Sequence, residues 1–186
     1  VVEAIERVPV ERHERQQHPV VADARDRQQP RRRDVGSGGP QRQQRLVLDA
    51  ARANLGAQTL FLMTADHGAQ WPFGKWNCYE AGVLVPLIVA WPGVVKPGAR
   101  TDALVSWVDL LPTLLEVGGG GAPSGIDGRS FAGVLRGTTT THRDRIFTTH
   151  SGDGRWNVYP IRSVRIGDWK YIRNLHPEFA FTAHID

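Results

Sequence analysis

Cysteine is almost missing from this chain of 186 residues, in which Cys78 stands alone. A single cysteine excludes an internal disulfide framework and a cysteine-rich zinc site. Long apolar runs are missing too, because no stretch approaches the roughly 18 residues that a membrane-spanning helix needs. The first residues also lack the charged and then apolar pattern of a secretory signal. We therefore expect no membrane span, and the compartment stays open.

Lysine is scarce, since arginine supplies 20 of the 23 basic residues, half of them before residue 46. The formal net charge of +4 raises the question of a nucleic-acid partner. Such a partner would require basic residues that follow one face or alternate with aromatic residues. Residues 1–45 contain no aromatic residue and carry seven acids. We therefore expect no nucleic-acid partner.

Residues 1–45 are rich in arginine, glutamine and proline and have no sustained helical or strand period. Such a composition buries too little apolar surface to offset the entropy of ordering. One interpretation is a disordered segment. The other is the out-of-frame translation of an arginine-rich gene, which would give a similar mixture of residues.

From residue 46 onward the pattern is that of a folded domain. Residues 46–55 have apolar residues at helical spacing and end at Gly56, a typical helix stop. Residues 59–65 and 83–93 have the apolar character of buried strands, and residues 77–82 can form a turn of helix. Because strands and helices alternate, we predict the α/β class, with a sheet layered by helices.

Residues 102–119 predict an amphipathic helix pair with Pro112 at a first helical position and Gly118 as the stop. Its expected apolar face consists of Leu104, Val108, Leu111 and Leu115. Residues 145–150 then read as a strand. Residues 159–175 alternate as an antiparallel hairpin does, with a Gly-Asp pair at the turn.

Asp66 and His67 directly follow the first predicted strand, where ligands gather in an open α/β sheet. A carboxylate suits Ca²⁺, Mg²⁺ or Mn²⁺, and an adjacent imidazole favours transition metals. Gly68 lets the backbone turn away without a side chain that would block the site. An Asp-His-Gly segment by itself is also compatible with a helix cap or a surface turn.

Lys75 follows in the same loop and is a compact cation that could grip a tetrahedral anion or stabilise a leaving oxygen. Large aromatic residues surround it in the sequence, at Trp71, Phe73, Trp76 and Tyr79. They could form a pocket wall of low dielectric, or they could simply pack the loop on the domain. The spacing does not separate these two interpretations.

A series of segments resembles the sulfatases of the alkaline phosphatase superfamily in order and spacing. They are "TLFLMTADHG", "GKWNCYEAGVLVPLIVAWPG", "LVSWVDLLPTLLEVGG", "IDGRSFAGVLRG" and "HRDRIF". The later "YPIRSVRIGDWKYIRNLHPE" resembles the heparan N-sulfatase-like branch. The resemblance covers residues 46–186. It implies a partial mixed sheet layered with helices in residues 46–150, and the start of a small antiparallel C-terminal sheet domain in residues 151–186.

The resemblance also implies a chemistry, the metal-dependent hydrolysis of sulfuric esters or N-sulfates in a sulfated small molecule or glycan. Asp66 and His67 match metal ligands, with Ca²⁺ as the first candidate and Mn²⁺ or Mg²⁺ as alternatives. Lys75 matches a catalytic cation that contacts the sulfate group and the nucleophile. His150 falls where the N-sulfatase-like branch has a histidine-bearing substrate loop. Oligomeric state is left open.

Several family features are missing. The family nucleophile is a formylglycine made in a Cys- or Ser-x-Pro-Ser-Arg context, whereas Cys78 is followed by Tyr-Glu-Ala-Gly. Leu84 and Ala90 stand where relatives commonly have arginine. We therefore expect a C-terminal fragment with little turnover alone. A phosphate or phosphonate ester hydrolase of the same superfamily and a non-catalytic remnant are the alternatives.

Overall fold

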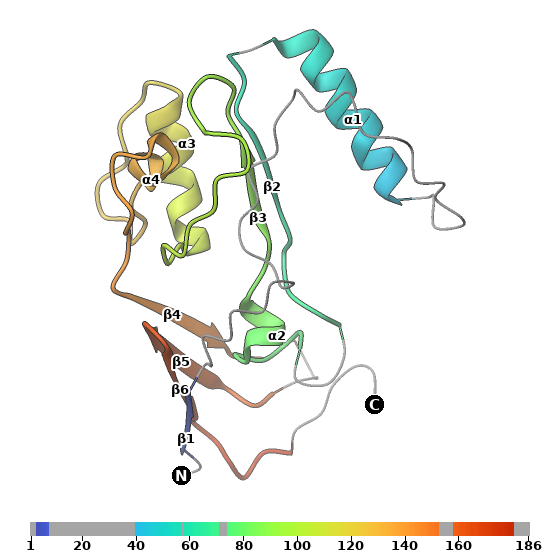
Figure 1. Cartoon of the computed structure of the whole chain (residues 1–186). Coiled ribbons are helices and arrows are strands. Elements are labelled where there is room, and N and C mark those ends of the chain that lie inside the picture. The colour runs from blue at the N-terminus through green and yellow to red at the C-terminus, as the bar shows by residue number, and fades with distance from the viewer. Residues whose placement is uncertain (1–2, 8–39, 57, 71–73, 153–157, 181–186) are drawn as a thin grey trace.

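The computed structural model describes residues 3–7, 40–56, 58–70, 74–152 and 158–180 (Figure 1). Two antiparallel sheets organise this part of the chain, one with strand order β1-β6-β5-β4 and one made of β2 and β3. The predicted α/β class, with a partial sheet, helices and a small antiparallel C-terminal sheet, is confirmed. The elements are β1 (Glu3–Arg7), α1 (Pro40–Leu55), β2 (Phe61–Thr64), α2 (Glu80–Val83), β3 (Leu87–Ala90), η1 (Trp107–Asp109), α3 (Leu110–Val117), α4 (Ala132–Arg136), β4 (Arg145–His150), β5 (Ile161–Ile166) and β6 (Trp169–Asn174).

The β2–β3 pair places the expected site at one end of a sheet. Phe61 pairs with Ala90 and Thr64 pairs with Leu87, so the carboxyl end of β2 lies beside the start of β3. Between the two strands, the chain passes through the Asp-His-Gly segment and then α2. Figure 1 shows α2 beside the end of β4, so this end of the β2–β3 pair meets the C-terminal sheet.

The C-terminal sheet contains the predicted hairpin, in which β5 pairs with β6 from Ile161↔Asn174 to Ile166↔Trp169. Gly167 at its turn has φ of 54°, a left-handed conformation that glycine adopts without steric cost. A small core of Cys78, Tyr159, Ile161 and Ile172, with Tyr79 packed against it, joins the segment before α2 to this sheet. The site loop and the C-terminal sheet therefore share one packed core.

The N-terminal part of the chain contributes one strand that the composition did not predict, and the beginning of a helix whose residues 46–55 were predicted. Strand β1 pairs antiparallel with β6, from Glu3↔Arg173 to Arg7↔Trp169. Helix α1 begins at Pro40, before the expected start at residue 46. The rest of the segment lies outside the described residues, so its interpretation as disordered or out of frame stays a prediction. None of the helices described is long and apolar enough to cross a membrane.

The predicted helix pair exists as η1 and α3, but its buried face was predicted wrongly. Val108 and Leu111 are 51% and 53% exposed, whereas Asp109, Pro112 and Thr113 are buried. Pro112 is the third residue of α3 rather than a first one. The apolar spacing identifies an amphipathic helix, yet hydrogen bonds to Asp109 and Thr113 decide which side faces the protein. Gly118 ends the helix as predicted.

Candidate functional site

Asp66 and His67 leave the end of β2 with their polar atoms close together. Asp66 Oδ2 lies 3.6 Å from His67 Nε2, and the two side chains are 84% and 28% exposed. Two ligands at right angles around a cation, each about 2.5 Å away, would be about 3.5 Å apart. The pair therefore has the separation of two neighbouring ligands of one divalent ion, and it faces solvent.

A hydrogen bond fixes which nitrogen of His67 is available. Nδ1 of His67 lies 2.8 Å from the carbonyl oxygen of Gly68, which can only accept, so Nδ1 carries the proton and donates it. In the neutral ring Nε2 then keeps its lone pair, on the side of Asp66. Metal-binding histidines are typically oriented in this way by a carbonyl behind the ring.

Backbone contacts between glycines hold the Asp66–His67 segment against α2. The N–H of Gly68 donates to the carbonyl of Gly82 at 2.9 Å, and that of Ala69 donates to the carbonyl of Ala81 at 2.8 Å. A Cβ on Gly68 would lie 1.9 Å from the oxygen of Ala81, which no side chain can tolerate. Gly68 is therefore needed for close approach to α2, as well as for the turn expected from the sequence.

Lys75 belongs to the same loop but its side chain lies on an aromatic ring. Its N–H donates to the carbonyl of Ala69 at 2.7 Å, and Nζ lies 4.4 Å from the centroid of the Trp76 ring. Trp76 has φ of 67°, unusual for a residue with a side chain. Of the predicted aromatic wall, Trp71 and Phe73 lie outside the described residues. The structure ties Lys75 to the Asp66–His67 segment through Ala69.

His150 is placed in the C-terminal sheet rather than in this loop. It is the last residue of β4, and its ring lies against that of Tyr159, with 5.1 Å between centroids. Arg162 donates to its backbone carbonyl at 2.9 Å. No group of three or more potential metal-ligating side chains occurs within the described residues. Asp66 and His67 would thus supply two ligands of a site completed by other groups.

Two buried polar atoms near the site were missed by sequence reasoning. Thr64 Oγ1, at the end of β2, and Asn77 Nδ2, just after Lys75, are buried without a hydrogen-bond partner among the described residues. Asn77 is 6% exposed, and its Oδ1 accepts from the N–H of Tyr79 at 2.9 Å. Unpaired buried polar groups are rare and are often found where a ligand or ordered water binds.

A second missed group, the carboxylate of Glu80 with two cations, lies under the site. Glu80 begins α2 and forms ion pairs with Arg165 of β5 and Lys170 of β6. The side chain of Lys170 is only 2% exposed. The strand period carried a signal, because Lys170 and the buried Ile172 lie on the same face of β6.

The strongest electrostatic cluster surrounds Asp109, which is completely buried. Its carboxylate accepts hydrogen bonds from Arg143 Nε at 2.7 Å and from the backbone N–H groups of Ser106 and Arg129, both at 2.9 Å. His142 Nε2 lies 3.1 Å away. Burial alone would raise the pKa of Asp109, but hydrogen bonds from Arg143, Arg129 and Ser106 outweigh it and lower the pKa from 3.8 to about 2.

This depressed pKa predicts a loss of stability in acid. A group whose pKa is lower in the folded protein stabilises the fold above its unfolded pKa, so the contribution of Asp109 disappears between about pH 4 and pH 2. The difference in unfolding free energy between wild type and Asp109→Asn should shrink by on the order of 2 kcal/mol as pH falls from 5 to about 2. Urea unfolding of both proteins at several pH values measures this difference. A difference that stays constant between pH 5 and about pH 2 would contradict the lowered pKa of Asp109.

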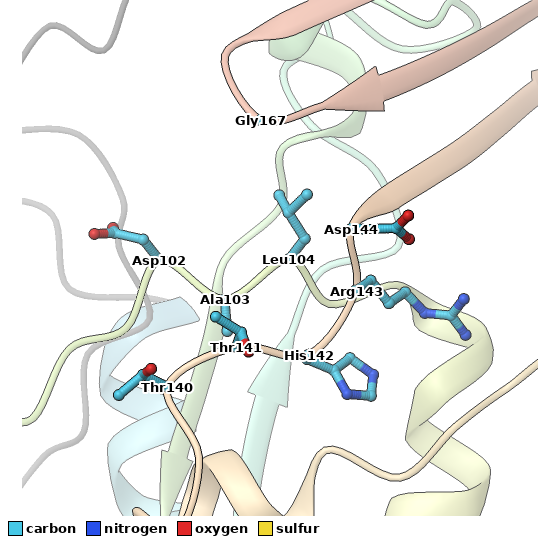
Figure 2. A pocket seen from close by; sticks show the side chains of 9 residues that line it. All are labelled: Asp102, Ala103, Leu104, Thr140, Thr141, His142, Arg143, Asp144 and Gly167. Atoms are coloured by element: carbon cyan, nitrogen blue, oxygen red, sulfur yellow. The ribbon is translucent and has the colours of Figure 1, made fainter.

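A shallow depression of about 290 Å³ lies beside this cluster, lined by residues 102–104, 140–144 and Gly167. Figure 2 shows the side chains of His142 and Arg143 pointing to the opposite side from Asp102. The Arg143 guanidinium instead donates to Asp109 and to the carbonyl of Asp127. Because the His142 and Arg143 side chains point away from Asp102 and Arg143 is already paired with Asp109, this depression is a poor site for a sulfate or phosphate group.

Comparison with known proteins links the chain to one group of enzymes. Residues 66–181 match the family model described as N-sulphoglucosamine sulphohydrolase, C-terminal. The chain is 34% identical over 132 residues to an ulvan-active sulfatase of Formosa agariphila, across 70% of this chain and 26% of the relative. It is 30% identical over 139 residues to arylsulfatase K of Mus musculus, across 68% and 24%. The chain therefore spans about a quarter of the length of these curated relatives.

Solved structures of related hydrolases are also similar to this chain. One protein, solved in complex with its substrate D-glucosamine-2-N,6-O-disulfate, is 25% identical with a TM-score of 0.63, across 72% of this chain and 29% of that one. A phosphonate monoester hydrolase from Silicibacter pomeroyi is 26% identical with a TM-score of 0.57, across 70% and 29%. Both similarities are partial on the side of the solved chain.

Proposed function

The chain belongs to the N-sulphoglucosamine sulphohydrolase C-terminal family of sulfatases, and on this basis we propose that it supplies part of a metal-dependent sulfuric ester hydrolase site. The resemblance to sulfatases expected from the sequence is thereby confirmed. The proposed substrate class is a sulfated sugar or glycan, since a similar structure holds a glucosamine disulfate.

The observation that carries the proposal is the geometry of Asp66 and His67. Their ligand atoms are 3.6 Å apart, and the Gly68 carbonyl leaves His67 Nε2 available. A divalent ion bound there would act as a Lewis acid that neutralises charge on sulfate oxygens. The resemblance to sulfatases makes Ca²⁺ the first candidate, with Mn²⁺ or Mg²⁺ as alternatives, and of these Mn²⁺ best suits the imidazole nitrogen beside the carboxylate.

Lys75 is proposed to contact the sulfate group. Its backbone bond to Ala69 keeps it in the loop that carries the two ligands. Nζ lies over the Trp76 ring, and because such a cation–π contact does not neutralise the ammonium group, its charge stays available for an anion. His150 stays a predicted substrate contact, whose ring is oriented by Tyr159.

The attacking group is proposed to come from outside these 186 residues. They contain no Cys- or Ser-x-Pro-Ser-Arg segment, and the one cysteine, Cys78, is 1% exposed and packed in the core. A buried thiol in apolar surroundings is a structural residue rather than a nucleophile. We therefore propose that the chain alone turns over sulfate esters slowly or not at all, while still binding metal at Asp66 and His67.

Paramagnetic Mn²⁺ tests the proposal in the isolated chain without requiring turnover. Titration into isotope-labelled protein should broaden the NMR signals of the His67 ring and the 66–69 amides first, and Ca²⁺ should reverse the effect. Asp66→Asn and His67→Gln should each raise the Mn²⁺ concentration that half-broadens the remaining 66–69 amides by about 10-fold or more, because loss of a metal ligand weakens binding at least as much as loss of a group that orients a ligand.

Asp168→Asn and His176→Gln are matched controls, since both side chains are exposed and outside the loop. They should leave the broadening at His67 unchanged. Equal broadening in wild type and in both ligand variants would contradict the proposed metal site. It would favour the alternative of a non-catalytic remnant.

A phosphonate ester hydrolase is the second candidate, and its support is the similarity to the enzyme of Silicibacter pomeroyi. The two classes differ in the anion that Lys75 would hold. With diamagnetic Ca²⁺ present, inorganic sulfate and methylphosphonate can be compared by the chemical-shift changes that they cause in the Lys75 and Ala69 signals. Stronger shifts with methylphosphonate would favour the second candidate.

A further inference from the structure

We infer that Lys170, with Arg165, is a positioning residue that holds the Asp66–His67 segment in place through Glu80. These cations lie on the C-terminal sheet and have no role in the chemistry itself. The functional consequence rests on the proposed metal site, whereas the mechanical coupling does not. Figure 1 shows why such coupling is possible, because α2 lies between the end of the β2–β3 pair and the C-terminal sheet.

The first link joins the C-terminal sheet to α2. Lys170 Nζ donates to the carbonyl of Cys78 at 3.0 Å and forms an ion pair with Glu80 Oε1. Arg165 Nη1 donates to Glu80 Oε2 at 2.9 Å. The Glu80 carboxylate is thus held by two cations from two strands, and Lys170 also fixes the backbone just before the helix.

The second link joins α2 to the site. The carbonyls of Ala81 and Gly82, directly after Glu80, accept the N–H groups of Ala69 and Gly68. The carbonyl of Gly68 in turn accepts a hydrogen bond from Nδ1 of His67. A displacement of α2 would therefore change the orientation of the imidazole that is proposed to bind metal.

The energetics favour a positioning role over simple stabilisation. Apolar side chains in place of both Lys170 and Glu80 would fill the same positions without the cost of burying charged groups, and such paired replacements are often neutral or stabilising. The lysine provides something that an apolar residue cannot. It gives directional bonds to a carboxylate and to a carbonyl, and these bonds set where α2 begins.

Lys170→Met is the direct test, because methionine keeps much of the volume and removes the charge. Hydrogen exchange at Gly68 and Ala69 should accelerate about 10-fold or more relative to the β5–β6 amides, since the lost bonds are charge-assisted and local. The Mn²⁺ midpoint at His67 should rise about 10-fold. Lys96→Met is the matched control, an exposed lysine outside both sheets.

The outcomes separate the two proposals. Faster hydrogen exchange confined to Gly68 and Ala69 supports the positioning role. If Mn²⁺ broadens no signal of His67 in the wild-type protein, that result contradicts the proposed metal site but not the positioning role. Unchanged exchange, or equal acceleration throughout the sheet, overturns the positioning role. If Lys170→Met does not fold, Arg165→Met carries the same test, because Arg165 is partly exposed and makes only the second bond to Glu80.

Discussion

Replacing Asp109 with alanine should lower the free energy of unfolding by about 3–5 kcal/mol, the usual cost of removing one partner of a buried ion pair. Asp109 is fully buried, and the side chain of Arg143 is only 15% exposed. Without the carboxylate, the guanidinium loses its buried counter-charge. The backbone N–H groups of Ser106 and Arg129 lose their acceptors as well.

The position of Asp109 explains why the loss should be global. Its oxygens join the turn before η1, the residues before α4 and the chain entering β4 at Arg143. Its backbone carbonyl also accepts from Thr113 Oγ1 at 2.6 Å, and the same hydroxyl accepts from the N–H of Phe131 at 3.0 Å. This one carboxylate therefore ties three segments of the helical layer to the chain that enters β4.

Urea unfolding of three variants measures the effect. Asp144→Ala is the matched control, because Asp144 is 70% exposed and pairs only with the neighbouring exposed Arg145 in the described contacts, so the free energy of unfolding should stay close to that of wild type. The double variant Asp109→Leu with Arg143→Met should regain part of the loss, since it leaves neither charge buried. A loss below about 1 kcal/mol for Asp109→Ala would show that the pair is dispensable.

The sequence predicted those features of the fold that depend on local pattern. The strand before Asp66 and the hairpin at Gly167 were found because apolar periodicity and turn residues are short-range signals. The buried face of α3 was predicted wrongly because it is set by the partners of Asp109, such as Arg143, which are far away in the sequence. Strand β1 was not predicted for the same reason, because its pairing partner, β6, lies near the other end of the sequence.

The candidate site residues were likewise proposed from local pattern. Asp66, His67 and Lys75 were predicted from residue types and order and their roles stay predictions, while the structure adds the orientation of the imidazole by the Gly68 carbonyl. The support beneath them was not recognised. Glu80 and Lys170 are separated by about half of the chain, and a lysine in a strand ordinarily indicates a solvent-facing position.

Replacing Gly68 with alanine should both destabilise the protein and abolish the proposed metal binding. The added Cβ would lie 1.9 Å from the Ala81 oxygen and 2.8 Å from its carbonyl carbon, and backbone atoms cannot move aside as a flexible side chain can. Forced repacking of this kind costs about 1–3 kcal/mol. The two hydrogen bonds from Gly68 and Ala69 to α2 would add about 0.5–1.5 kcal/mol each if they are broken.

Gly121→Ala is the matched control and should have the opposite sign. A Cβ at Gly121 meets nothing within 4 Å, and the backbone there is not left-handed. Such a substitution stabilises by about 0.4–1 kcal/mol because it restricts the unfolded chain. In Gly68→Ala, the Mn²⁺ broadening at His67 should be lost even at temperatures where the variant is folded, because the hydrogen bonds from residues 68 and 69 to α2 no longer hold the imidazole in place. Retained broadening with wild-type stability would mean that the contact between Gly68 and α2 does not position His67.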